Sequence, residues 1–148
     1  MSSSLVIPML ICVDAASEIE FCRRAFNAQE LSRRSGNDGS VVHATLQVGT
    51  TMFMVHGEYP HLESRAPRPD GSSSVVIYIY VENVDAVIAR AVEAGAAILL
   101  PATDQAWGDR VGRIMDTAGH VWNVAAHNDR SAAALLREIQ KTADLLGR

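Results

Sequence analysis

The chain has 148 residues, of which 48% are hydrophobic and 20% are charged, the proportions of a globular domain rather than of a disordered or collagen-like chain. Its formal net charge is −4 and it has no long run of Lys and Arg, so the composition disfavours a nucleic-acid partner. The longest strongly apolar run, residues 75–81, is far short of the ~20 residues that span a bilayer, which argues against a membrane protein.

The beginning of the chain and its two cysteines indicate a cytoplasmic protein. Residues 5–13 are apolar, but no Lys or Arg precedes them and Pro8 interrupts them, so we interpret them as a buried first strand rather than a secretion signal. Cys12 and Cys22 cannot make a disulfide framework and lack the C-x-x-C spacing of a zinc or redox site. We expect both to be small buried hydrophobic residues in a reducing compartment.

The first half of the chain predicts a strand, a helix and three further strands. The apolar residues 7–13 end at Asp14, which can cap a helix running to about Asn27, with Glu18 near the positive end of the helix dipole. A polar edge strand is expected at 29–35. Strands at 41–48 and 51–56 are expected on either side of a tight turn.

The same order of elements returns in the second half. Residues 59–74 contain prolines, glycine and three consecutive serines, which is typical of a linker. A strand at 75–81 and a helix at 84–94 follow, the helix being ended by Gly95. Three more strands are expected at 97–100, 110–115 and 121–126. Asp14 and Glu82, at the starts of the two helices, are separated by about 70 residues, as are other matching positions of the two halves.

The repeat predicts an α+β fold of two βαβββ modules, followed by a C-terminal helix. We place a single domain at 1–130, with module 1 at about 5–58, the linker at 59–74 and module 2 at about 75–127. The C-terminal helix at 131–148 is expected to be capped by Ser131 and ended by Gly147. Its apolar face would contain Leu135, Ile139, Ala143 and Leu146.

A segment in the second half carries a family resemblance. Trp107-Gly108-Asp109-Arg110 leads into a strand, and a D-x-x-G hairpin at 116–119 precedes the last strand. With the duplicated modules, this segment resembles the glyoxalase-like or bleomycin-resistance-like branch of the vicinal oxygen chelate superfamily, which also holds dioxygenases and fosfomycin-resistance proteins. The resemblance covers residues 5–127. It implies two sheets curled around a cup, and a homodimer in which the C-terminal helix packs on the partner or caps the sheet.

The same resemblance implies positions for a metal site, but this sequence departs from the pattern. Metal-using members place one ligand on the first strand and one on the last strand of each module. Those positions correspond here to Ile7, Val76, Phe53 or Met54, and Asn123. Apolar side chains cannot coordinate a metal and a single Asn is a weak neutral ligand, so we expect neither a metal nor another cofactor.

The histidines offer a weaker alternative. His56, Glu58 and His61 form a local cluster of ligand types, but at a strand end and not on one helix face, so we interpret them as a solvated loop. His43 can line the cup and could act as a general acid or base. His120 and His127 are expected to have structural or surface roles, with His120 bonding its own turn.

The aromatic residues suggest a cup for an organic ligand. Alternation along a strand puts Val76, Tyr78 and Tyr80 on one face, while Trp122 has the opposite parity to Asn123 and should pack beneath a helix. The resemblance puts Trp107 at the rim of the cup. The candidate ligand-binding residues are Tyr78, Tyr80, Trp107, Arg110, Asn123, His43, Phe53 and Met54.

The function predicted from these residues is metal-independent binding or sequestration of a small hydrophobic or aromatic molecule, resembling bleomycin-resistance-like proteins. The residues favour binding over catalysis, and they assign no catalytic residue. One alternative is a glyoxalase-type lyase, isomerase or dioxygenase with a relocated metal site. The other is a non-catalytic structural dimer in which these side chains fill the cup or the dimer interface.

Overall fold

The computed structural model describes residues 3–59, 63–68, 70, 73–127 and 129–147. Pro60, His61, Pro69 and Gly71 of the predicted linker therefore lie outside the described residues. The helices and strands are β1 (Met9–Cys12), α1 (Ala15–Phe26), β2 (Gln29–Ser35), β3 (Val41–Val48), β4 (Thr51–Gly57), β5 (Val76–Tyr80), α2 (Val84–Glu93), β6 (Ala97–Asp104), β7 (Asp109–Met115), β8 (Val121–His127) and α3 (Asp129–Leu146).

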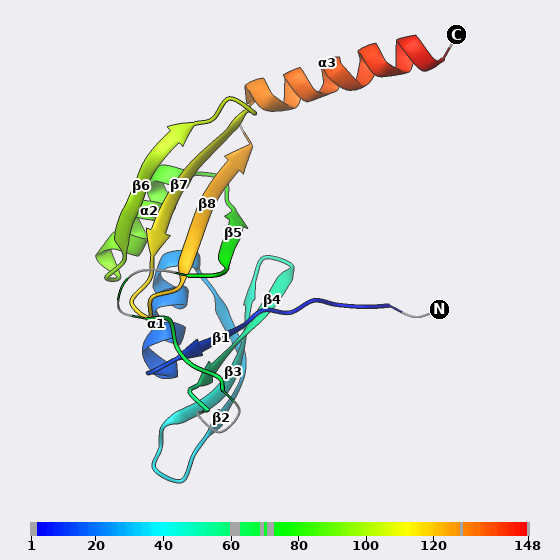
Figure 1. Ribbon diagram of the computed structural model, residues 1–148. Helices are drawn as coiled ribbons and strands as arrows, with labels where there is room; N and C mark the ends of the chain where they lie inside the picture. The colour runs from blue at the N-terminus through cyan, green and yellow to red at the C-terminus, as the bar shows by residue number, and fades with distance from the viewer. Residues whose placement is uncertain (1–2, 60–62, 69, 71–72, 128, 148) are drawn as a thin grey trace.

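Two four-stranded mixed sheets with the same topology confirm the duplicated βαβββ prediction. The strand orders are β1-β4-β3-β2 and β5-β8-β7-β6. In each sheet the first strand pairs in parallel with the last strand, and the other pairs are antiparallel. Helices α1 and α2 contact each other and lie on the same side of the molecule, while α3 projects away from both sheets (Figure 1).

Local chemistry explains where the two helices begin. The Asp14 side chain accepts a hydrogen bond from the backbone N–H of Ser17 at 3.2 Å, and Asn83 accepts one from Ala86 at 3.0 Å. Both caps satisfy amide groups that the first helical turn leaves without partners. The match between the two halves put Glu82 at the start of the second helix, whereas its capping residue is Asn83. Asn83 is one position closer to the helix, from which a short side chain reaches the third residue on.

Aromatic side chains join the two modules in the core. Trp122 of β8 is 3% exposed, as expected from its parity, and its ring lies 4.6 Å from that of Phe26 on α1 and 5.8 Å from that of Phe53 on β4. Cys12 and Cys22 are free and buried, as predicted. The helix-covered faces of both sheets therefore share one hydrophobic core.

Several element boundaries differ from the predictions. Residues 5–13 were interpreted as a buried first strand, but β1 covers only Met9–Cys12, because its ladder with β4 extends no further, and Leu5, Val6 and Val13 are exposed. Strand β6 does not stop at residue 100 but continues through Pro101 to Asp104, because an edge strand tolerates a proline and the register shifts between Leu100 and Thr103. Helix α3 begins at Asp129 and not after Ser131, because an acidic residue two positions earlier also suits a helix N-terminus. Among the described residues, no helix is long and apolar enough to cross a membrane.

Candidate functional site: the open face of the second sheet

Each sheet turns one face toward the helices and leaves the other face open. On β5, Ile79 is buried, whereas Tyr78 and Tyr80 are 48% and 51% exposed. The register places Tyr78 opposite Asn123 of β8, and Asn123 opposite Arg113 of β7, so these three residues share the open face. The adjacent pairs on this face are apolar, namely Val76 with Val121 and Val111 with Ala125. This makes the face a candidate surface for an organic ligand.

A hollow of about 350 Å³ lies on this open face, at the lower end of the size range of small-molecule sites. We call it the β5–β8 hollow. Its lining combines aromatic, aliphatic and a few polar side chains. The lining residues are Tyr78, Leu100, Pro101, Thr103, Gln105, Trp107, Val111, Gly112, Arg113 and Asn123. Of the predicted ligand-binding residues, the hollow brings together Tyr78, Trp107 and Asn123.

The polar centre of the hollow is a pair that the sequence reasoning only half identified. Arg113 Nε donates a hydrogen bond to Asn123 Oδ1 at 2.7 Å, and Asn123 is buried. Arg113 was not among the predicted residues. Alternation along β7 puts Arg113 on the same face as Val111, but its pairing with Asn123 follows from the strand register, which a local pattern does not give.

A second polar cluster lies on the same face, around Asp109. The buried Asp109 carboxylate accepts hydrogen bonds from the Tyr80 hydroxyl at 2.9 Å and from His127 Nδ1 at 2.8 Å, and the rings of Tyr80 and His127 stack at 4.5 Å. Burial opposes the charge of Asp109, but these hydrogen bonds outweigh it and hold the pKa of Asp109 below its usual value. The bond to Asp109 in turn raises the pKa of Tyr80. Tyr80 thus belongs to this cluster and does not line the β5–β8 hollow.

Arg110 lies apart from the β5–β8 hollow. Its guanidinium donates to both carboxylate oxygens of Asp85 on α2 at 2.9 Å, and to Asp104 of β6 at 3.2 Å. These hydrogen bonds raise the pKa of Arg110 further above its usual value. The arginine of the WGxR segment therefore ties α2 to the edge of the sheet, on the helix-covered face.

The remaining predicted residues belong to the first sheet, where the register separates Phe53 from Met54. Phe53 faces the core and contacts Trp122, whereas Met54 pairs with Met9 and Thr45 on the open face. His43 lies opposite His56 on that face, with ring centroids 5.9 Å apart. Partial burial and the positive charge of Arg34 lower the pKa of His43. The first sheet thus presents a separate open face with two imidazoles.

The metal implied by the resemblance does not fit the residues present. The matching side chains are those of Ile7, Val76, Met54 and Asn123, and the one oxygen among them already accepts a hydrogen bond from a guanidinium cation. In the part of the chain that the structure describes, no group of three or more His, Cys, Asp or Glu side chains could hold a metal ion. Glu58 instead accepts a hydrogen bond from the backbone of Ala66, and His61 lies outside the described residues.

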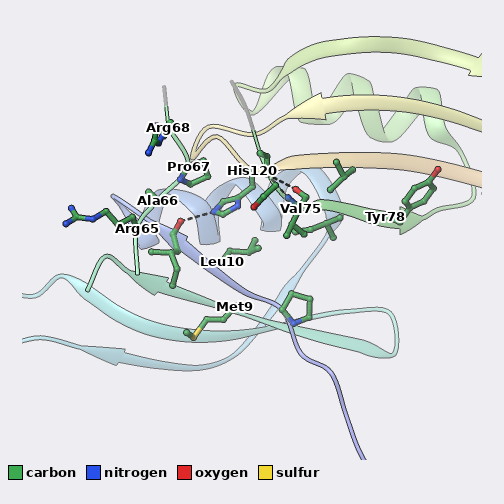
Figure 2. Close-up of a pocket in the computed structure, with 15 residues that line it drawn as sticks. Met9, Leu10, Arg65, Ala66, Pro67, Arg68, Val75, Tyr78 and His120 are labelled. Atoms are coloured by element: carbon green, nitrogen blue, oxygen red, sulfur yellow. Dashed lines mark hydrogen bonds between the residues drawn. The ribbon is translucent and has the colours of Figure 1, made fainter. Parts of the chain in front are cut away.

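Two further hollows adjoin the first. One of about 810 Å³ lies between β1, the linker and β5, and Figure 2 shows Arg65 and Arg68 extending away from it. Another of about 260 Å³ lies between β4 and β5. Tyr78 lines all three hollows. The largest hollow is lined by His120, whose backbone bonds its own turn, as predicted: its N–H donates to Asp116 Oδ1 at 2.9 Å. The ring of His120 reaches further and donates to the Ile11 carbonyl at 2.8 Å, because the hairpin of module 2 packs against β1 (Figure 2).

Comparisons with known proteins agree with this geometry. The sequence model of the Glyoxalase/Bleomycin resistance protein/Dioxygenase superfamily matches residues 5–124. An uncharacterized protein of Mycobacterium tuberculosis is 39% identical over 120 residues, covering 79% of this chain and 71% of that protein. The crystal structure of TioX from Micromonospora sp. ML1 has a TM-score of 0.67 at 28% identity, covering 85% of this chain and 100% of TioX.

A third similar protein shows the fold alone. The fosfomycin resistance protein FosX from Listeria monocytogenes, crystallised with Mn(II) and a sulfate ion, has a TM-score of 0.67 at 15% identity. The match covers 90% of this chain and 99% of FosX. At this level of identity the likeness extends to the arrangement of helices and strands and not to the ligands of FosX.

Proposed function

Because the chain belongs to the Glyoxalase/Bleomycin resistance protein/Dioxygenase superfamily, we propose that it uses the open face of its second sheet to bind a small hydrophobic or aromatic molecule without a metal. The observation that carries this proposal is the pairing of exposed aromatic side chains with a hollow. Tyr78 is 48% exposed and Trp107 is 64% exposed, although both line the β5–β8 hollow. Large aromatic surfaces left in water at a concave site favour a planar apolar ligand.

Binding and sequestration need no activated nucleophile, and the polar groups of the hollow suit orientation of a ligand better than reaction with it. The Asn123 amide and the Arg113 guanidinium bond each other, and neither is a proton acceptor strong enough to act as a base. We therefore propose that the chain acts in the cytoplasm by binding a compound and either sequestering or carrying it.

A second copy of the chain is the proposed partner. The open faces of both sheets carry exposed apolar side chains, including Met9, Met52 and Val76. A homodimer would cover part of this surface and could close the cup over a ligand. If the side chains of the two copies filled the cup completely, the structural-dimer alternative would apply in place of ligand binding.

A specific observation favours one alternative function, an enzyme of the same superfamily. Asp109 holds His127 through Nδ1, an arrangement that orients an imidazole for acid–base work at its other nitrogen. A relocated metal at His43 and His56 is the other form of this alternative, since their rings are neighbours on the first sheet.

Titration with N-phenyl-1-naphthylamine, a neutral aromatic dye, tests the binding proposal. We expect saturable binding and quenching of tryptophan emission, because Trp107 is exposed in the hollow while Trp122 is buried. The Tyr78→Ala and Trp107→Ala variants should each weaken binding by roughly tenfold, the usual effect of removing an aromatic anchor. Val92→Ala, an exposed apolar change on α2, is the matched control and should bind as the natural chain does.

Three results would contradict the proposal. The first is no dye binding by the natural chain, and the second is dye binding that both aromatic substitutions leave unchanged. The third is near-stoichiometric metal in protein purified without chelator, lost on His43→Ala or His56→Ala, which would support the relocated metal site of the enzyme alternative.

A further inference from the structure

Arg113 is the charged side chain of the β5–β8 hollow. Of the described residues that line this hollow, none is acidic and no other is basic. We infer that the ligand carries an anionic oxygen group, such as a carboxylate, and that Arg113 binds this group while the aromatic side chains hold the apolar body. This inference rests on the proposed function and narrows its ligand class to aromatic or apolar organic acids.

The charge of Arg113 is not neutralised within the described part of the chain. Three other arginines, Arg23, Arg33 and Arg110, form ion pairs with carboxylates, whereas the hydrogen bond of Arg113 goes to a neutral amide. A half-buried guanidinium with no counter-charge gains more from an anionic ligand than from water alone. The Asp109 carboxylate on the same face is already engaged by Tyr80 and His127.

The hydrogen bond to Asn123 also leaves the terminal edge of the Arg113 guanidinium, with its two nitrogens, available for a ligand. Asn123 accepts the Nε hydrogen, which restrains the plane of the group, and the two terminal nitrogens have no hydrogen-bond partner among the described residues. Two parallel N–H groups match the two oxygens of a carboxylate. Tyr78 and Trp107 flank the hollow, and their low polarity strengthens a charge-assisted hydrogen bond made there.

A matched pair of ligands tests this inference. 2-Naphthoate and 2-naphthamide have nearly the same shape and differ in charge, so equilibrium dialysis of both against the whole chain isolates the contribution of the anion. We expect the natural chain to bind naphthoate about tenfold more tightly than naphthamide, and raised salt to reduce this preference.

Two substitutions on one strand assign the preference to a residue. Arg113→Gln should abolish it, and Arg113→Lys, which keeps the charge but not the planar fork, should retain part of it. Arg110→Gln removes the same charge from the helix-covered face of β7 and should leave the preference unchanged. Circular dichroism of each variant confirms that it folds.

Each other outcome overturns the inference in a distinguishable way. Equal binding of the two compounds, or tighter binding of naphthamide, would remove the anionic ligand class while leaving the binding function intact. A naphthoate preference that survives Arg113→Gln would place the anion elsewhere. If the neutral dye binds but neither 2-naphthoate nor 2-naphthamide does, the inference is also rejected. If none of the three compounds binds, the proposed binding function itself is rejected.

Discussion

Among single residues, Glu18 is the one whose role departs most from what its position in the chain indicates. A glutamate in the first turn of a helix interacts favourably with the positive end of the helix dipole, and such a side chain is ordinarily solvated. Here the Glu18 side chain is wholly buried; its Oε1 accepts a hydrogen bond from the Cys22 thiol at 3.4 Å. Its Oε2 has no partner among the described residues. Burial, and secondly the neighbouring Asp116 carboxyl group, raise the pKa of Glu18 well above its usual value.

This buried acid predicts a stability that falls as pH rises. The folded chain keeps the Glu18 proton above pH 4.5, where the unfolded chain releases it. Stability is therefore lost by about 1.4 kcal/mol per pH unit until the folded pKa is reached. Glu18→Gln has no charge to bury and should be more stable than the natural chain at about pH 8, with the difference shrinking toward about pH 5. Urea denaturation across this range measures it.

The exposed Glu20 on the same helix provides the control. A hydrogen bond from Arg23 lowers the pKa of Glu20, so Glu20→Gln should show no gain in stability with rising pH. A Glu18→Gln variant that is less stable than the natural chain at every pH would contradict the prediction, because it would mean that the Glu18 side chain is ionised and usefully paired in the folded state.

The candidate site shows what residue patterns can and cannot predict. Alternation correctly put Tyr78 and Tyr80 on one face of β5 and Asn123 on the face of β8 opposite to Trp122, since it needs only the period of a strand. Arg110 was included in the site by its place in the WGxR motif, whereas the side chain faces Asp85 of α2. That contact joins residues 25 positions apart, and pairings of this kind depend on tertiary packing that a local pattern does not contain.

At the level of helices and strands, the clearest signals were chemical ones at element ends. Asp14 was predicted as a cap and Gly95 as a helix terminator, and both occupy those places. The lengths of β6 and α3 were predicted less well. Proline usually ends a strand, but Pro101 is tolerated because β6 is an edge strand. Serine is often a helix cap, but α3 begins two residues before Ser131, at an acidic residue.

Gly95 provides a test of how tightly one helix end is packed. Its φ is +110°, and an added Cβ would lie 2.7 Å from Thr117 Cγ2, so alanine would meet both backbone strain and a steric clash. We expect Gly95→Ala to lower the free energy of unfolding by about 2–3 kcal/mol. Gly49 has a φ of +57° with no atom within 4 Å, and Gly49→Ala should cost only about 1 kcal/mol. Equal losses in thermal or urea denaturation would show that packing against Thr117 is unimportant.

For the whole molecule, duplication made the fold predictable. The pattern of strands and helix returns after about 70 residues, so one prediction of the βαβββ order serves both halves of the chain. The second half then tests the order predicted for the first. The relation between the modules could not be derived in that way. It depends on contacts such as those of Trp122 with Phe26 and Phe53, and of His120 with the Ile11 carbonyl, which link one module to the other.

The open faces of the two sheets lead to a prediction about assembly. Helices α1 and α2 lie on one side of the molecule (Figure 1). The strand register puts Met52 of β4 and Val76 of β5 on the sheet faces that these helices leave open, and both side chains are exposed. We expect a second copy to cover them, because an apolar surface continued over two sheets favours association. Light scattering should give twice the chain mass of 16.0 kDa.

Charge placed on that surface should separate the copies. Met52→Lys and Val76→Lys each bury a cation in the expected interface and should shift the chain to a monomer at micromolar concentrations, since a buried unpaired charge costs several kcal/mol. Val92→Lys, a change of the same kind on the helix side, should leave the dimer intact. A natural chain that is monomeric throughout would contradict the prediction, and the cup would then have to be closed by the ligand within one chain.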